Sequence, residues 1–361
     1  MKSVIVVGYS NDTIAQAQRE PFMFYEKQLR TALNLEVKQF TADTFNEIDK
    51  ICRTYDSDIV FLLPSWRESV NNDLLNRSED IVKNLKIDYP NRKLIFIDPF
   101  AQISSNYFRL LPYVDYFLKR QCYKDLELYK KKFIGGSLFT DFLAKHWNLD
   151  FSKWYVGSQL PENNIHKIIP GWNLGTAKKF KQSLFRKHIL GLGFGKRKKT
   201  IDIFCRLSLG DTSKNEWYTQ YRIMSVEALK PLVTDYQVAK NSSDANNLVS
   251  LRQYNFEIQN SKIVFSPFGW GENCWRDFEA ICYDCLLIKP SMSHVTTIPN
   301  IFVDYETYVP VKWDFSDLEE KCRYYLEHPN QADKIIRNAR KAYQKYFQQE
   351  EFLKIIEKLI Q

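Results

Sequence analysis

Short apolar runs alternate with longer amphipathic stretches through the first third of the chain. Apolar runs rich in β-branched residues predict strands at 4–7, 35–39, 58–63, 93–97 and 114–118. Apolar residues at helical spacing predict helices at 13–33, 44–53 and 73–85. Strands that alternate with helices form a parallel, doubly wound sheet with right-handed crossovers.

The same alternation restarts after a stretch rich in proline, glycine and basic residues, between residues 161 and 199. Strands are predicted at 200–205, 234–239, 262–266, 286–289 and 301–303, and helices at 216–229, 245–257, 273–283 and beyond 316. We therefore expect Rossmann-like domains at 1–190 and 191–345, and a last helix at 346–361 that returns to the first domain. Two such open sheets facing each other enclose a central cleft.

Composition and length fit an ordinary globular protein. The chain has 361 residues, of which 44% are hydrophobic and 26% charged. The first apolar run is too short for a signal sequence, and no run approaches the roughly eighteen residues that span a bilayer. Seven scattered cysteines suit reduced thiols, and Cys282 and Cys285 lack a second ligand pair for zinc. We expect a cytoplasmic protein without a metal.

The net charge of +8 is concentrated between Lys178 and Lys199, where nine basic residues and no acidic residue occur. Such a stretch attracts anions, including nucleotide phosphates, an acidic acceptor, nucleic acid or an anionic membrane. A solvated face accounts for it equally well. Its aromatic residues, Phe180, Phe185 and Phe194, are too few to favour nucleic acid.

The segment from Ser266 to Pro290 carries the strongest candidate chemistry. It predicts a strand end, a loop made flexible by Gly269 and Gly271, a helix capped by Asn273, and a buried strand. A helix start preceded by glycines offers free N–H groups and a positive dipole end, which together suit a phosphate.

Charged residues on this predicted helix share one face. Arg276 and Glu279 are three positions apart, and Glu272 precedes Glu279 by seven. Carboxylates at these positions suit sugar or ribose hydroxyls, while the guanidinium balances a diphosphate. A surface salt bridge explains the same residue types.

The segment resembles the donor-site signature of exostosin-like and spore-maturation-type bacterial glycosyltransferases, in the GT-B group known as glycosyltransferase group 1. The likeness runs from about 262 to 346 and includes Ser-Pro-x-Gly-x-Gly-Glu, then Arg-x-x-Glu-Ala and Cys-Leu-x-Ile. It implies a GT-B fold, with Glu279 on the ribose, Arg276 on the diphosphate and Glu272 on the donor sugar. Asp284 replaces the glycine that is common in the family.

Secondary candidates come from their positions in the predicted domains. By the same resemblance, Arg206, Lys214 and Arg222 are candidate phosphate partners, although structural salt bridges explain the first two equally well. In the first domain, loops that follow strands span 9–12, 65–68 and 98–100, and an inverting enzyme would use Asp98 or Glu68 as its base. A retaining enzyme needs no such base.

We further expect residues 170–173 to line the acceptor cleft, and His294 to be a polar loop residue near the donor site. The glycines at 191, 193 and 195 precede a strand, so they are no dinucleotide fingerprint.

These observations predict transfer of a sugar from a nucleotide diphosphate sugar to a hydroxyl on a glycan or lipid-linked acceptor, in bacterial surface glycan assembly. No cofactor is expected, because cationic side chains and a helix dipole stabilise a leaving diphosphate. Residues 178–199 would hold the enzyme at the inner face of the membrane. The alternatives are a sugar-nucleotide epimerase or hydrolase on the same fold, and a non-catalytic protein that binds nucleotides or nucleic acid.

Overall fold

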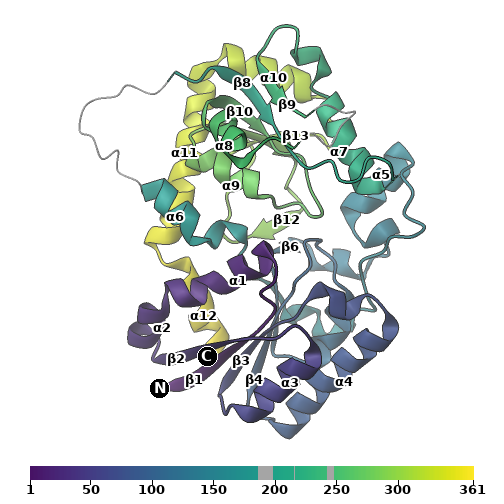
Figure 1. Ribbon diagram of the computed structural model, residues 1–361, viewed down its shortest axis with the longest axis vertical. Coiled ribbons are helices and arrows are strands. Elements are labelled where there is room, and N and C mark those ends of the chain that lie inside the picture. The colour runs from purple at the N-terminus through teal and green to yellow at the C-terminus, as the bar shows by residue number, and fades with distance from the viewer. Residues whose placement is uncertain (186–197, 215, 242–247) are drawn as a thin grey trace.

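The computed structural model describes residues 1–185, 198–214, 216–241 and 248–361 (Figure 1). Within these residues, a six-stranded sheet has the order β2-β1-β3-β4-β5-β7 and a five-stranded sheet the order β13-β11-β10-β8-β9, and neighbouring strands are parallel in both. The strands of the first sheet are β1 (Lys2–Gly8), β2 (Leu35–Thr41), β3 (Ile59–Leu63), β4 (Lys93–Ile97), β5 (Tyr116–Lys119) and β7 (Ile168–Pro170). Those of the second are β8 (Ile201–Cys205), β9 (Val238–Lys240), β10 (Ser261–Phe265), β11 (Leu286–Pro290) and β13 (Val309–Val311). The predicted α/β fold with two Rossmann-like sheets is confirmed.

Each face of the first sheet is covered by helices. Val4 and Val6 of β1 pack toward α1 (Thr13–Phe24), α2 (Glu26–Ala32) and α12 (Glu351–Ile360). Ile5 and Val7 point the other way, toward α3 (Phe45–Thr54) and α4 (Asn72–Asp88). This alternation is the two-residue period of a strand, and both faces are apolar because helices cover both.

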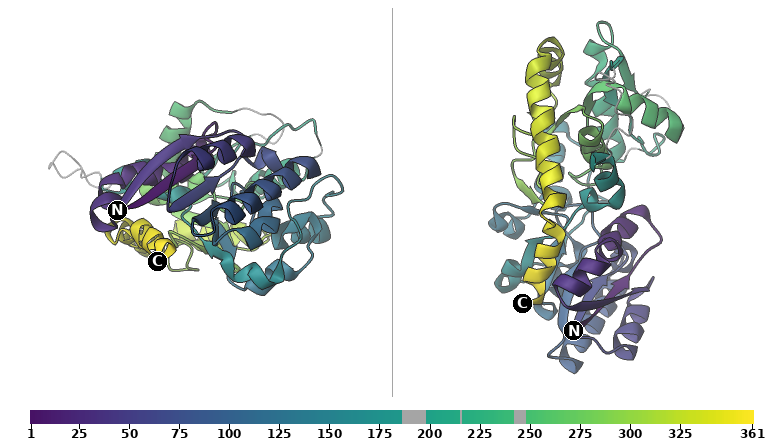
Figure 2. Two further views of the ribbon diagram at one scale, coloured as in Figure 1. Left: turned by 90° about the horizontal axis from the view of Figure 1, so that it is seen from below. Right: turned by 90° about the vertical axis from the view of Figure 1, so that its left-hand side faces the viewer.

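The remaining helices complete the second half of the chain and the connections. They are α5 (Leu138–Trp147), α6 (Lys178–Phe185), α7 (Trp217–Glu227), α8 (Leu251–Gln259), α9 (Trp275–Cys282), α10 (Leu318–Glu327) and α11 (Pro329–Gln348). Short 3-10 helices occur at Trp66–Ser69, Asn106–Tyr113, Leu126–Lys130, Ile134–Gly136, Glu162–Lys167, Leu174–Thr176 and Lys230–Leu232. In Figure 2, α11 runs along the second half and α12 continues beside the first sheet. The C-terminal helices α11 and α12 therefore pack against both halves of the chain and connect them.

Two predicted elements differ from the structure. The helix expected at 13–33 is broken at Tyr25, whose buried ring stacks on Phe352 with 5.3 Å between centroids. The strand expected at 301–303 is irregular, because Thr307 Oγ1 accepts the Val303 N–H and donates to the Ile301 carbonyl. Those backbone groups bond a side chain instead of a neighbouring strand. The domain boundary expected at 190/191, the start of the helix expected at 245 and the glycines of 191–195 lie outside the described residues.

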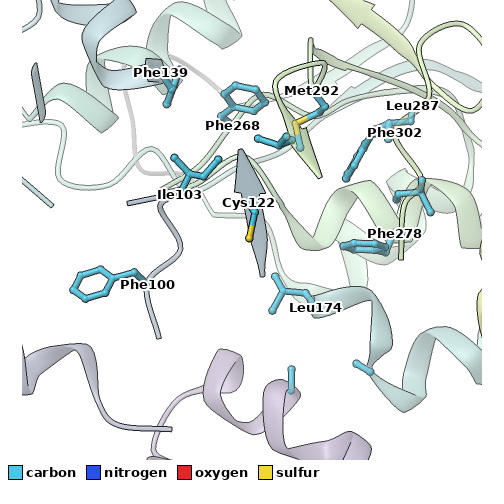
Figure 3. Close-up of a cluster of buried hydrophobic side chains, with 14 of the residues drawn as sticks. Phe100, Ile103, Cys122, Phe139, Leu174, Phe268, Phe278, Leu287, Met292 and Phe302 are labelled. Carbon is cyan, nitrogen blue, oxygen red and sulfur yellow. The ribbon is translucent and has the colours of Figure 1, made fainter. Parts of the chain in front are cut away.

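The two halves share a buried apolar core. β6 (Gln121–Tyr123) pairs antiparallel with β12 (Val295–Thr297), so a strand next to the first sheet bonds one from the second half. Figure 3 shows apolar side chains from both halves around Cys122 of β6, among them Phe139, Phe268 and Met292. This shared core fixes the loops that face each other between the sheets.

Candidate functional site

A cleft of about 880 Å³ lies between the two sheets. Its wall in the first half is α1, together with Ala101, Arg120, Leu174, Ala177 and Lys179. Its wall in the second half is Leu207, Ser208, Arg222, Tyr254, the loop 269–271, and the residues Asn273, Cys274, Trp275, Arg276 and Glu279. The cleft therefore lies where open α/β sheets bind ligands.

The start of α9 is fixed by a buried carboxylate. Asp277 accepts a hydrogen bond from the Cys274 N–H at 2.9 Å and from Ser266 Oγ at 2.6 Å, and its other neighbour is Lys289 Nζ at 3.2 Å. Cys274 is thus the N-cap, so the prediction that Asn273 caps this helix is wrong. Ser266 is fully buried on Asp277 and does not line the cleft, which contradicts its predicted contact with the donor.

The glycine loop packs directly against the first half of the chain. A Cβ on Gly271 would lie 1.9 Å from the Ala101 carbonyl oxygen, whereas the nearest atom to a Cβ on Gly269 is 3.7 Å away. The Gly269 N–H also donates to the Gly271 carbonyl at 2.9 Å. Gly271 is therefore required by close approach, and Gly269 is not.

We expect Gly271→Ala to lower stability by about 1–3 kcal/mol, as overpacking does, and to weaken nucleotide binding by displacing the loop. Gly269→Ala serves as the matched control and should change stability by no more than about 0.5 kcal/mol. Thermal melting and calorimetric titration with UDP measure both effects. Equal behaviour of the two variants would contradict the close packing of Gly271.

Two half-buried arginines line the cleft beside this loop. Arg276 donates to the carbonyls of Arg206 and Pro267, each at 3.4 Å, and its buried Nε has no partner. Arg222 donates to the Ser208 carbonyl at 2.9 Å. Burial lowers the pKa of Arg222, and the charge of Arg276 lowers it further. An anion in the cleft would relieve both effects and would supply the missing acceptor.

Glu279 lines the cleft from the same helix as Arg276. Its Oε2 accepts a hydrogen bond from the Tyr254 hydroxyl at 2.8 Å, and Lys179 Nζ lies 3.8 Å from Oε1. Burial, followed by the charge of Glu279, raises the pKa of Tyr254 far above its ordinary value, so the phenol stays protonated and donates. The carboxylate is thereby oriented while it still lines the cleft.

Glu272 and Asn273 are held by one residue of the first half. Gln121 Nε2 donates to Glu272, and Gln121 Oε1 accepts from Asn273 Nδ2 at 2.6 Å and from the Asn273 N–H at 3.2 Å. Glu272 is 2% exposed, has His294 Nε2 at 3.6 Å, and does not line the cleft. Glu272 therefore positions the loop, which contradicts its predicted contact with the donor sugar. His294 lies in the turn before β12 (Val295–Thr297), as expected of a loop residue, with its side chain 9% exposed beside Glu272, and it does not line the cleft.

Two predicted phosphate partners also lie elsewhere. Arg206 forms a bidentate pair with Glu257, with distances of 2.8 and 2.9 Å, and does not line the cleft. Lys214 is 66% exposed, and its partner is Asp211 at 3.6 Å. Both residues therefore form salt bridges within the chain, which was the alternative interpretation of the sequence. Of the three candidate phosphate partners, Arg222 is the one that lines the cleft.

The predicted acceptor residues of the first half are structural as well. Asp98 is fully buried, pairs with Lys119 and accepts from Ser105 Oγ at 2.7 Å, so it cannot take a proton from an acceptor. Glu68 accepts the Phe45 N–H at 3.0 Å. In the segment 170–173, Trp172 packs its ring on Phe352 in the core instead of lining the cleft.

A second cavity of about 410 Å³ adjoins the cleft and lies against the first sheet. It shares Ile14, Ala101, Arg120 and Trp270 with the cleft. Its other lining residues are Tyr9, Asp12, Ala15, Gln18, Pro64, Trp66, Arg67, Pro99, Phe100, Gln102, Trp154 and Val156. The three predicted loops after strands supply much of this wall. Arg120 was missed, although a basic residue just after the predicted strand at 114–118 is a usable signal.

Comparison with known protein families gives a match in the second half of the chain. Residues 216–357 match a family model described as Glycosyl transferase-like. No curated protein sequence matches the chain.

Several solved structures are similar in fold. A glycosyltransferase from Rickettsia africae ESF-5 is 9% identical, with a TM-score of 0.50 and coverage of 100% of this chain and 99% of that one. An α,α-trehalose-phosphate synthase (UDP-forming) from Burkholderia vietnamiensis is 8% identical, with a TM-score of 0.47 and coverage of 97% and 99%. A UDP-GlcNAc 2-epimerase from Neisseria meningitidis, bound to UDP-GlcNAc, is 10% identical, with a TM-score of 0.45 and coverage of 98% and 100%.

The family match covers residues 216–357, and the two facing parallel sheets give the chain the GT-B fold. The predicted enzyme class, a glycosyltransferase, is confirmed at this level. The exostosin-like and spore-maturation-type subfamily stays a prediction. Within the described ranges, no helix is both long and apolar enough to cross a bilayer.

Proposed function

We propose that this protein transfers a sugar from a nucleotide diphosphate sugar, bound in the cleft, to a hydroxyl of an acceptor in the adjoining cavity. The observation that best supports this proposal is the pair of half-buried guanidinium groups of Arg222 and Arg276, which line the cleft beside the glycine loop. The Nε of Arg276 is buried and has no partner. A diphosphate matches this arrangement in charge and in hydrogen bonding.

The chemistry follows from the positions of these cations. The bond between the anomeric carbon and the diphosphate oxygen breaks, and the same carbon forms a bond to the acceptor oxygen. The proton of the acceptor hydroxyl passes to the leaving diphosphate or to water. The negative charge that develops on the leaving nucleoside diphosphate is stabilised by Arg222 and Arg276, which the fold holds in place before reaction. This stabilisation is available to either stereochemical outcome.

Glu279 is proposed to bind the ribose. It lies on the same helix as Arg276, three residues further from the helix start, at about the separation of a ribose from its diphosphate. Tyr254 and Lys179 hold the carboxylate, and ribose hydroxyls would donate to it.

Glu279→Ala is expected to weaken UDP or other nucleotide binding by about 10- to 100-fold, the usual effect of losing hydrogen bonds to a charged group. Glu319→Ala, an exposed glutamate of α10 that pairs with Arg323, is the control and should bind as the wild type does. Isothermal titration with a panel of nucleotides and nucleotide sugars measures the affinity. Unchanged affinity of Glu279→Ala for every nucleotide that the wild type binds would refute this role.

Product analysis tests the reaction itself. Incubation of a bound nucleotide sugar with and without acceptor should yield a new glycoside only when acceptor is present. An epimerised sugar nucleotide or free sugar, formed equally without acceptor, would instead identify the epimerase or hydrolase alternative.

The surface glycan role and the membrane contact through residues 178–199 stay predictions. Of that stretch, residues 186–197 lie outside the described ranges. Lys179 lies 4.1 Å from the Trp275 ring centroid, and Lys181 4.7 Å from that of Phe24. These two lysines thus have partners within the chain. If the purified protein does not bind anionic vesicles at low salt, the membrane prediction is wrong.

A further inference from the structure

Arg120 is a buried cation without a direct ion pair among the described residues. The residue is 6% exposed, its Nη2 donates to the Pro99 carbonyl at 3.2 Å, and its buried Nε has no partner. Within the described residues, no carboxylate lies within 4.0 Å of its guanidinium. Burial lowers its pKa to about 10, so it carries its charge at neutral pH. The carboxylates of Asp98 and Asp12 attract this charge without pairing with it directly. A buried charge without a direct partner is costly, and a bound anion would offset that cost.

Two residues that line the second cavity carry a buried polar atom without a partner. Gln18 is 2% exposed with Oε1 unpartnered, and the indole Nε1 of Trp154 is buried without an acceptor. One atom accepts and the other donates, so together they suit a ligand that carries hydroxyl groups. A buried polar atom without a partner calls for an explanation, and a bound polar ligand supplies one at this cavity.

The cavity also has broad aromatic walls. Trp154 and Trp270 pack with 5.0 Å between centroids and 32° between planes, and Trp66 is 44% exposed at the rim. The flat C–H face of a pyranose packs well on such rings, while its hydroxyls need polar partners at the edges. This combination of surfaces favours a saccharide.

The charges that line the second cavity favour an acidic saccharide over a neutral one. Arg67 lines only the second cavity, and its Nη1 donates to the Tyr9 hydroxyl at 2.7 Å. Among the described lining residues, Asp12 is the one carboxylate, and its Oδ1 already accepts the N–H groups of Ile14 and Ala15. Two guanidinium groups against one carboxylate leave a positive cavity. Under the proposed function the donor diphosphate meets Arg222 and Arg276, and Arg67 lies outside the lining of that cleft.

We propose, building on the proposed function, that the acceptor is an acidic saccharide, with its ring against Trp154 and Trp270 and its anionic group on Arg120 and Arg67. A carboxylate, as in a uronic acid, and a sugar phosphate share this chemistry. The carboxylate or the phosphate would supply a negative charge next to the guanidinium groups of Arg67 and Arg120.

The test is calorimetric titration of the whole protein with methyl β-glucuronide, glucose 6-phosphate and neutral methyl β-glucoside. We expect at least one acidic probe to bind at least about tenfold more tightly than the neutral one, and the preferred probe distinguishes carboxylate from phosphate. Arg67→Gln and Arg120→Gln should each weaken the preferred acidic probe by about tenfold, with no effect on the neutral probe. Arg77→Gln, an exposed arginine of α4, is the matched control and should change neither.

Neutral and acidic probes of equal affinity would overturn the proposal, and so would acidic binding that survives both changes. Arg67 is exposed, so its variant tests the proposal even where Arg120→Gln fails to fold. Titration of the same samples with UDP separates the two proposals. A wild type that binds UDP but shows no preference for the acidic probes overturns only the acceptor proposal, whereas a wild type that binds no nucleotide overturns the proposed function.

Discussion

Arg276→Gln is expected to lower kcat for sugar transfer by about 100- to 1,000-fold, the usual effect of removing one preorganised group from a developing negative charge. The guanidinium is held by the carbonyls of Arg206 and Pro267 before any ligand binds, and its Nε still lacks a partner. Glutamine retains part of the side-chain volume but carries no charge. The loss should therefore appear mainly in kcat, with a smaller effect on KM.

Lys214→Gln is the matched control, because it removes a basic residue that the same resemblance assigned to the phosphates. Lys214 is exposed and lies outside the cleft lining, so its variant should retain wild-type kcat. Steady-state kinetics under saturating donor, with a folding check by circular dichroism, compare the two. A folded Arg276→Gln enzyme with unchanged kcat would contradict the diphosphate role.

The sequence pattern was sufficient for the fold and for one side of the cleft. Alternating apolar runs located nine of the eleven described strands of the two sheets, because both faces of a parallel sheet are buried and each strand stands out from its polar surroundings. Arg276 and Glu279 were found because both lie on one short helix, where spacing along the chain determines position in space.

Contacts between the halves were not predictable in this way. Gln121 binds Glu272 and Asn273 across about 150 residues of sequence, and no local pattern marks such a partner. Glu272 therefore had the right residue type and the right spacing, and still faces Gln121 instead of the cleft. The second cavity was missed for the same reason, since Trp66, Trp154 and Trp270 meet only after folding.

Asp98 illustrates a different failure, because its position at a strand end was predicted correctly and its burial was not. Its carboxylate pairs with Lys119, which is 1% exposed and also donates to the Ser104 carbonyl at 3.1 Å. A carboxylate after a strand suits a catalytic base and a buried ion pair equally, and only the tertiary structure distinguishes them.

Asp98→Ala is expected to lower the free energy of unfolding by about 3–5 kcal/mol, because it leaves the Lys119 ammonium buried without its counterion. Asp88→Ala breaks an exposed pair with Arg53, whose side chains are 44% and 39% exposed, and should cost no more than about 1 kcal/mol. Urea unfolding followed by circular dichroism measures both variants. A buried Asp98–Lys119 ion pair predicts this large difference in the free energy of unfolding between the two Asp→Ala variants. Equal losses of stability in the two variants would contradict it.

The double variant Asp98→Ala/Lys119→Met separates burial of charge from loss of packing. Methionine removes the stranded ammonium and fills most of the lysine volume beside Phe108, whose ring centroid lies 5.6 Å from Lys119 Nζ. Because well-packed apolar side chains replace buried ion pairs at little cost, the double variant should recover most of the lost stability. It should also retain sugar transfer, since neither residue lines the cleft or the second cavity. A stable double variant without activity would instead restore Asp98 as the base.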